Sequence, residues 1–216
     1  MGADYLAIVV DLMVLVAVAV FYTGFAVWFN YRKDDLNRAN AALRQGGVAI
    51  VLLGVLLGVL GMFGELYQPL FNLSYNVFFF DPLTMLAFLL VVFGVLILLR
   101  LSTTIVGVLG AASGVAVLYY GVVAYQDGLT LDPVETLLMY IAFGVLACAL
   151  LIPTLFIDWF ITGPKYPNTQ PIASDPTPKY PMMWNLLIGI FMLTVFLAGL
   201  AAALYGLNIA WGHILP

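Results

Sequence analysis

Six long stretches of mostly apolar residues constrain this chain most, because each is long enough to cross a lipid bilayer. A membrane-spanning helix needs about 20 predominantly apolar residues. Only 8% of the 216 residues are charged, whereas a soluble domain carries about 25%. The sequence therefore predicts one all-α transmembrane domain over residues 1–216. It is a polytopic bundle in the lipid bilayer with six helices at about 5–29, 47–67, 82–100, 103–125, 133–160 and 182–211.

The basic residues predict how these helices are oriented. All seven fall in three of the five connections, and in a chain with six spans those three connections share one side of the membrane. Lys and Arg are retained on the cytoplasmic side. Both termini are therefore predicted to lie outside, in the cell (cytoplasmic) membrane. The basic residues are Arg32, Lys33, Arg38, Arg44, Arg100, Lys165 and Lys179.

Glycine residues recur at helical spacing on the second and fourth predicted helices. Gly54 and Gly58 are four residues apart, and so are Gly110 and Gly114. Small residues let helix backbones approach closely in lipid, where no hydrophobic effect drives helices together. We expect these faces to contact neighbouring helices. Pro153 is expected to bend the fifth helix, because it removes one backbone donor.

The third and fifth predicted helices begin alike, with Asp81-Pro82-Leu83-Thr84 and Asp132-Pro133-Val134-Glu135. Asp followed by Pro is typical of a helix start, so Asp81 and Asp132 are predicted to be helix caps. Glu135 has the spacing of a capping box. The likeness also indicates helical hairpins repeated in the same membrane sense. Chance similarity between apolar helices is the alternative.

Ionisable residues within or beside the spans are the candidates for chemistry, because charge is costly in a bilayer. Carboxylates and an imidazole could bind a divalent cation or pass protons. Capping or solvation at the interface competes with these roles, except at Asp11, which no cap explains. The ion, proton or metal candidates are Asp11, Glu65, Asp81, Asp132, Glu135 and His213.

Other motifs are few. No catalytic residues, haem ligands or iron–sulfur motif are evident, and the sequence requires no cofactor. No basic tract indicates nucleic acid. Asn72-Leu73-Ser74 is a glycosylation sequon on the predicted outer face. The uncharged aromatic loop 68–80 is predicted to lie in the membrane interface or against a neighbouring protein. Asp158 is expected to pair with Lys165 or Arg100.

The run Phe79-Phe80-Asp81-Pro82-Leu83-Thr84 at a helix start, in a six-span chain of this length, resembles a family of small prokaryotic membrane proteins. That family is known as domain of unknown function family 981 and is found largely in archaea. The resemblance covers most of the chain and implies a cytoplasmic-membrane location and a prokaryotic origin, with archaea as the expected source. It implies no activity.

Three functions remain open from the sequence. The leading hypothesis is a non-catalytic integral membrane subunit of a larger membrane complex, respiratory or otherwise redox-linked, with other membrane protein subunits as partners. The second is a transporter or channel for protons, cations or a small solute. The third is a membrane enzyme with an outer-face metal site built from Asp11, Glu65, Asp81 and His213.

Overall fold

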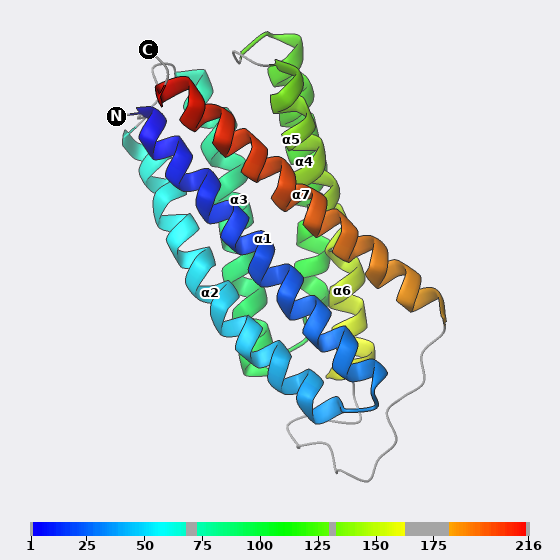
Figure 1. Ribbon diagram of the computed structural model, residues 1–216. Coiled ribbons are helices and arrows are strands. Elements are labelled where there is room, and N and C mark those ends of the chain that lie inside the picture. The colour runs from blue at the N-terminus through cyan, green and yellow to red at the C-terminus, as the bar shows by residue number, and fades with distance from the viewer. Residues whose placement is uncertain (1, 68–72, 130–132, 163–181, 215–216) are drawn as a thin grey trace.

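The computed structural model describes residues 2–67, 73–129, 133–162 and 182–214, which are almost entirely helical. Six helical spans are long and apolar enough to cross a membrane, which confirms the all-α, multi-pass architecture (Figure 1). The elements are α1 (Gly2–Arg32), α2 (Leu36–Tyr67), α3 (Leu73–Leu99), α4 (Thr104–Gln126), α5 (Pro133–Ala149), α6 (Leu151–Phe156), the π-helix η1 (Ile157–Ile161) and α7 (Met182–Ile214). Together α5, α6 and η1 make the fifth span.

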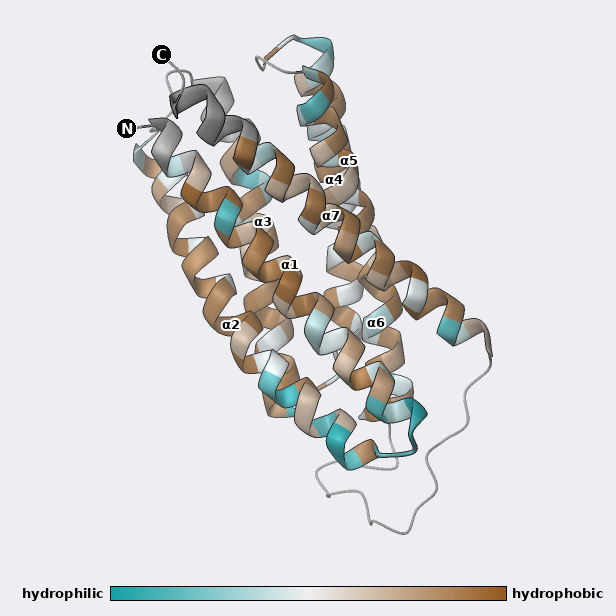
Figure 2. Cartoon of the chain, viewed as in Figure 1, coloured by the Kyte–Doolittle hydropathy of each residue, from teal (hydrophilic) through white to brown (hydrophobic). Residues whose placement is uncertain are grey.

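The two ends of the bundle differ in charge. The first turn of α1 and the last turn of α7 lie at one end, here called the terminal end. The α1–α2 and α3–α4 connections lie at the opposite end, and the described basic residues lie in these connections or on the helix turns next to them, so it is called the basic end. Figure 2 shows hydrophilic residues concentrated at the basic end, with apolar residues covering the middle of every span.

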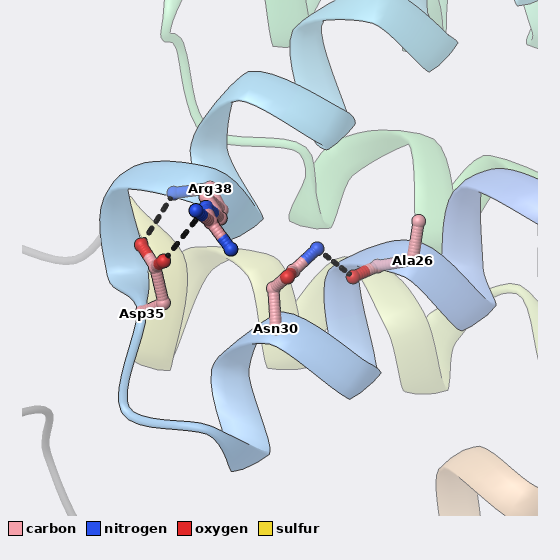
Figure 3. Close-up of polar contacts among 4 residues, drawn as sticks. All are labelled: Ala26, Asn30, Asp35 and Arg38. Carbon is pink, nitrogen blue, oxygen red and sulfur yellow. Dashed lines mark hydrogen bonds and ion pairs between the residues drawn. The ribbon is translucent and has the colours of Figure 1, made fainter.

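Helix α2 begins eleven residues before its predicted start, so the predicted inner loop is largely helical. Asp35 supplies the reason: its Oδ1 accepts from the Arg38 backbone N–H at 2.9 Å, and its Oδ2 pairs with the Arg38 guanidinium at 3.1 Å (Figure 3). An aspartate at this position satisfies a free amide of the first turn. Leu36, Ala39 and Leu43 are buried, so this polar-looking segment still has an apolar face.

Helix α3 corrects a second prediction. It begins at Leu73, so Asp81 and Pro82 lie inside the helix and Asp81 is not its cap. Pro82 has no N–H, which leaves the carbonyl of Phe78 without its usual helical donor. The Tyr140 hydroxyl on α5 donates to that carbonyl instead. A hydrogen bond from another helix thus lets α3 continue through Asp81-Pro82, where the local sequence favours the start of a helix.

The same segment overturns the predicted aromatic loop over the part that is described. Residues 73–80 are helical, while 68–72 lie outside the described residues. Phe80 is fully buried, and its ring is 5.7 Å from that of Tyr5 on α1. These aromatic side chains belong to the bundle itself, so they no longer argue for a neighbouring protein.

The fifth span is broken near Pro153, as its missing N–H predicts. Helix α5 ends at Ala149, four residues before the proline, and α6 begins at Leu151. The Thr154 hydroxyl lies 3.1 Å from the Leu150 carbonyl and 2.9 Å from the Leu151 carbonyl, which supplies a donor near the break. The following turn widens into η1.

Glycines lie where two helix pairs come closest. A Cβ added at Gly54 would be 3.0 Å from Leu90 on α3. One added at Gly114 would be 2.6 Å from the Gly144 carbonyl on α5, closer than real Cβ atoms come. Gly110 faces Leu150 in the same way, at 2.9 Å. At Gly58 the nearest atom would be 3.5 Å away, which is ordinary contact.

Candidate functional site

A cavity of about 170 Å³ lies between the two halves of the bundle. One half contains α1, α2, α3 and α7, and the other contains α4, α5 and α6. The cavity is partly open to its surroundings, and its walls come mainly from α1, α3, α5 and α7. For comparison, an engineered apolar cavity of about 150 Å³ in another protein stays dry and binds benzene. This interhelical cleft is large enough to hold part of a hydrocarbon molecule.

The lining of the cleft is almost entirely apolar. Among the described residues that line it, only four have side chains with nitrogen or oxygen: Thr23, Trp28, Ser113 and Tyr140. Three of these bond to the protein itself. Thr23 donates to the Ala19 carbonyl, the Trp28 indole N–H to Asn185 and the Tyr140 hydroxyl to the Phe78 carbonyl. Because water in a cavity needs two to four polar partners, this lining favours hydrocarbon over water.

The cleft extends along most of the membrane thickness. On α1 its lining residues run from Val9 to Trp28, which is about 28 Å at 1.5 Å per residue. On α3 they run from Phe79 to Ile97. The hydrocarbon core of a bilayer is about 30 Å thick. An extended chain could therefore lie in the cleft parallel to the helices.

A polar group borders the cleft at the terminal end. The Tyr120 hydroxyl on α4 donates to Asp81 Oδ2 on α3 at 3.1 Å. Tyr120 and Tyr205 pack against the buried Tyr140 and its apolar neighbours. We call Asp81, Tyr120, Tyr140 and Tyr205 the tyrosine–aspartate cluster. It joins the four helices α3, α4, α5 and α7 at the point where Phe79 and Tyr140 form the end of the cleft.

Aromatic rings close the bundle at the basic end. The Trp184 ring on α7 lies 6.1 Å from Phe156 and 5.5 Å from Phe160. The Tyr31 ring on α1 lies 5.4 Å from Phe156. Such contacts contribute about 0.5–1.5 kcal/mol per pair beyond the area they bury. These aromatic contacts tie the two halves at the basic end, as the tyrosine–aspartate cluster does at the terminal end.

Asp158 on η1 organises the α3–α4 connection at the basic end. Its carboxylate accepts from the backbone N–H groups of Thr103 and Thr104, both at 2.8 Å. The hydroxyls of Ser102, Thr103 and Thr104 also donate to it, at 2.6–2.9 Å. Of the two expected partners, Lys165 lies outside the described residues, so that pairing stays a prediction, and Arg100, which the structure describes, forms no ion pair with Asp158. The described hydrogen bonds make the carboxylate a cap at the start of α4, which is a structural role.

The structure disperses most of the acidic candidates. Asp11 is exposed on α1, beside Gly206 of α7. Glu65 is half-buried near the end of α2, and Glu135 is exposed in the first turn of α5. Asp132 and Asn72 lie outside the described residues, as does the His213 side chain. Within the described part of the chain, no three His, Cys, Asp or Glu residues are placed to hold a metal ion.

Sequence reasoning identified Asp81 but missed its hydrogen-bond donor Tyr120, the Tyr140 hydroxyl that bonds to the Phe78 carbonyl, and the cleft. One signal was present: a proline inside a long apolar stretch leaves the carbonyl four residues earlier in need of a donor. A tyrosine on another helix is a natural source of that donor. Nothing in the sequence indicates which tyrosine supplies it, because the answer depends on which helices become neighbours.

These features define a multi-pass helical membrane protein with an apolar interhelical cleft. The chain belongs to the family described as protein of unknown function (DUF981), whose model matches residues 1–215. No curated protein and no solved structure matches it significantly.

Proposed function

We propose that this protein is a non-catalytic integral membrane protein that binds a long hydrocarbon chain in its interhelical cleft. The chain would be the acyl or isoprenoid tail of a membrane lipid. One observation carries the proposal, the chemistry of the lining. The described lining side chains are almost all apolar, and three of the four that contain nitrogen or oxygen hydrogen-bond to the protein itself.

The surrounding medium supports this choice of ligand. The six spans place the cleft within hydrocarbon, and its partial opening gives lipid chains a way in. An empty cavity would forfeit the dispersion contacts of its lining. A lipid chain restores those contacts without a desolvation cost. Ions would instead need several polar groups along a path, and the described lining offers few.

Filling the cleft tests the proposal. Val20 lines the cleft in the middle of α1, whereas Val18, two residues away, is 60% exposed on the lipid-facing side. In Val20→Phe the added ring would occupy the cleft, and Val18→Phe is the matched control. Native mass spectrometry after mild detergent extraction would count retained lipids. We expect one chain-bearing molecule on the wild type and on Val18→Phe, and loss from Val20→Phe. Equal retention by all three proteins would overturn the proposal.

Membership of a larger membrane complex remains a prediction, compatible with lipid binding. Native gels of mild detergent extracts test it, and a lone monomer would count against it.

We also propose that the terminal end faces outward, because the basic residues lie at the opposite end and Lys and Arg are retained on the cytoplasmic side. Cysteine labelling of intact cells at position 128, in the α4–α5 turn, is then expected to succeed, whereas labelling at position 34 is expected to fail.

A further inference from the structure

We propose that the ligand of the cleft is an amphiphile with a hydrogen-bond-donating hydroxyl head. The tyrosine–aspartate cluster would hold this head, and the tail would run towards Trp28. The inference rests on the proposed function, because it adds a head group and a direction to a chain in the cleft.

The cluster and the cleft share a boundary, so one molecule can reach both. Five residues that pack in or against the cluster also line the cleft, from α3, α4 and α5: Phe79, Val117, Met139, Tyr140 and Phe143. Pro82, next to Asp81 in the chain, lines it too. A chain in the cleft would therefore bring its terminal-end head beside the Asp81 carboxylate.

Hydrogen-bond accounting decides what kind of head fits. A tyrosine hydroxyl has one proton to donate. Tyr120 gives its proton to Asp81, and Tyr140 gives its proton to the Phe78 carbonyl. An ionised carboxylate can only accept. The remaining capacity of these three groups is therefore to accept, which suits a head that donates, such as an alcohol or a hydroquinone.

The other end of the cleft suits a tail. Its walls there are Trp28, Leu43, Ile97 and Ile157, and the Trp28 indole N–H is already bonded to Asn185 at 3.0 Å. A head group placed there would lose its hydration and find few partners. A tail end would contact the Trp28 ring, so a quencher on the tail should report on this tryptophan.

The experiment uses matched probes in nanodiscs: geranylgeraniol, its methyl ether, and long-chain alcohols brominated at the tail end or beside the head. We expect the alcohol to bind about tenfold more tightly than the ether, as one hydrogen bond to a charged group predicts. The tail-brominated alcohol should quench tryptophan fluorescence more than the head-brominated one. This extra quenching should disappear in Trp28→Phe.

The double variant Asp81→Leu/Tyr120→Phe removes donor and acceptor together, so neither is left buried without its partner. It should weaken alcohol binding about tenfold and leave ether binding unchanged. Asp11→Leu, which removes an exposed acid at the same end, should change neither. Equal binding of alcohol and ether, or stronger quenching by the head-brominated probe, would overturn this inference and leave chain binding intact. No saturable binding of any probe would overturn the proposed function as well.

Discussion

The α2–α3 pair and the contact between the two halves show two ways in which helices meet in one bundle. Along α2, glycines face α3, and a Cβ at Gly64 would come within 2.4 Å of the Phe80 ring. Between the halves, large side chains such as Phe93 and Phe143 line a cavity instead. In lipid no hydrophobic effect forces helices together. Side-chain shape therefore decides which contacts close and which stay open.

The largest loss of stability is expected from a substitution that disrupts the close contact between α4 and α5. In Gly114→Leu the new side chain would meet the Gly144 carbonyl and the Cys148 backbone nitrogen, which belong to the opposite helix and cannot move aside. We expect a loss of about 3 kcal/mol in stability, with poor recovery of monodisperse protein. Thermal unfolding in detergent measures it. Unchanged stability would show that α4 and α5 are not packed as described.

A smaller loss of stability is expected when Asp158, which fixes the α3–α4 connection at the basic end, is replaced. Asp158→Ala would leave the amides of Thr103 and Thr104 without their acceptor. Loss of such a cap costs about 2 kcal/mol. Asp158→Asn keeps one acceptor oxygen and should lose about half as much. Hydrogen exchange of the first turn of α4 is expected to rise in both variants. Protection equal to wild type would mean that the carboxylate is not the cap.

Removing the hydrogen bond from Tyr140 to the Phe78 carbonyl, which joins the two halves at the terminal end, should lower stability moderately, by an amount that depends on Pro82. Tyr140→Phe removes the donor to the Phe78 carbonyl and is expected to cost about 1 kcal/mol. Pro82→Ala restores a backbone N–H that can bond to the same carbonyl. In that background Tyr140→Phe should cost close to nothing. A double-mutant cycle on unfolding midpoints measures the difference. Additive effects of the two substitutions would contradict the conclusion that the Tyr140 hydroxyl replaces the backbone donor that Pro82 lacks.

The smallest effect is expected at Gly58, which serves as the control for Gly114. An added methyl would meet Ala87 at 3.5 Å, an ordinary contact. Because Ala is favoured over Gly in a helix by up to about 1 kcal/mol, Gly58→Ala should be neutral or slightly stabilising. A large loss of stability would mean that α2 and α3 are closer than the structure shows.

The sequence predicts the six spans well because each depends on local apolar character, which lipid requires whatever the helices pack against. The predicted helix boundaries are wrong where a cap or a tertiary contact outweighs the structural preference of the local sequence. Residues 36–46 are polar enough that the span was predicted to start at about residue 47, yet the Asp35 cap and a buried face at Leu36, Ala39 and Leu43 extend α2 across them. Asp81-Pro82 looks like a helix start, yet a hydroxyl from α5 supplies the missing donor.

The candidate site was predicted less well, for a physical reason. A metal or ion site is recognisable from charged residue types, so the sequence pointed to residues such as Asp11 and Glu65. A hydrocarbon site is built from the same Val, Leu and Phe residues that form every span. Its position depends on which apolar faces remain apart, as at Phe93 and Phe143. That is a property of tertiary packing.

An experimental density map of the protein in lipid nanodiscs tests the central claim most directly. The account predicts continuous rod-shaped density between α1, α3 and α5, running from the level of Tyr140 to that of Trp28. Ordered water in that space, or halves that close so that Phe93 packs on Phe143 with no room between, would contradict it.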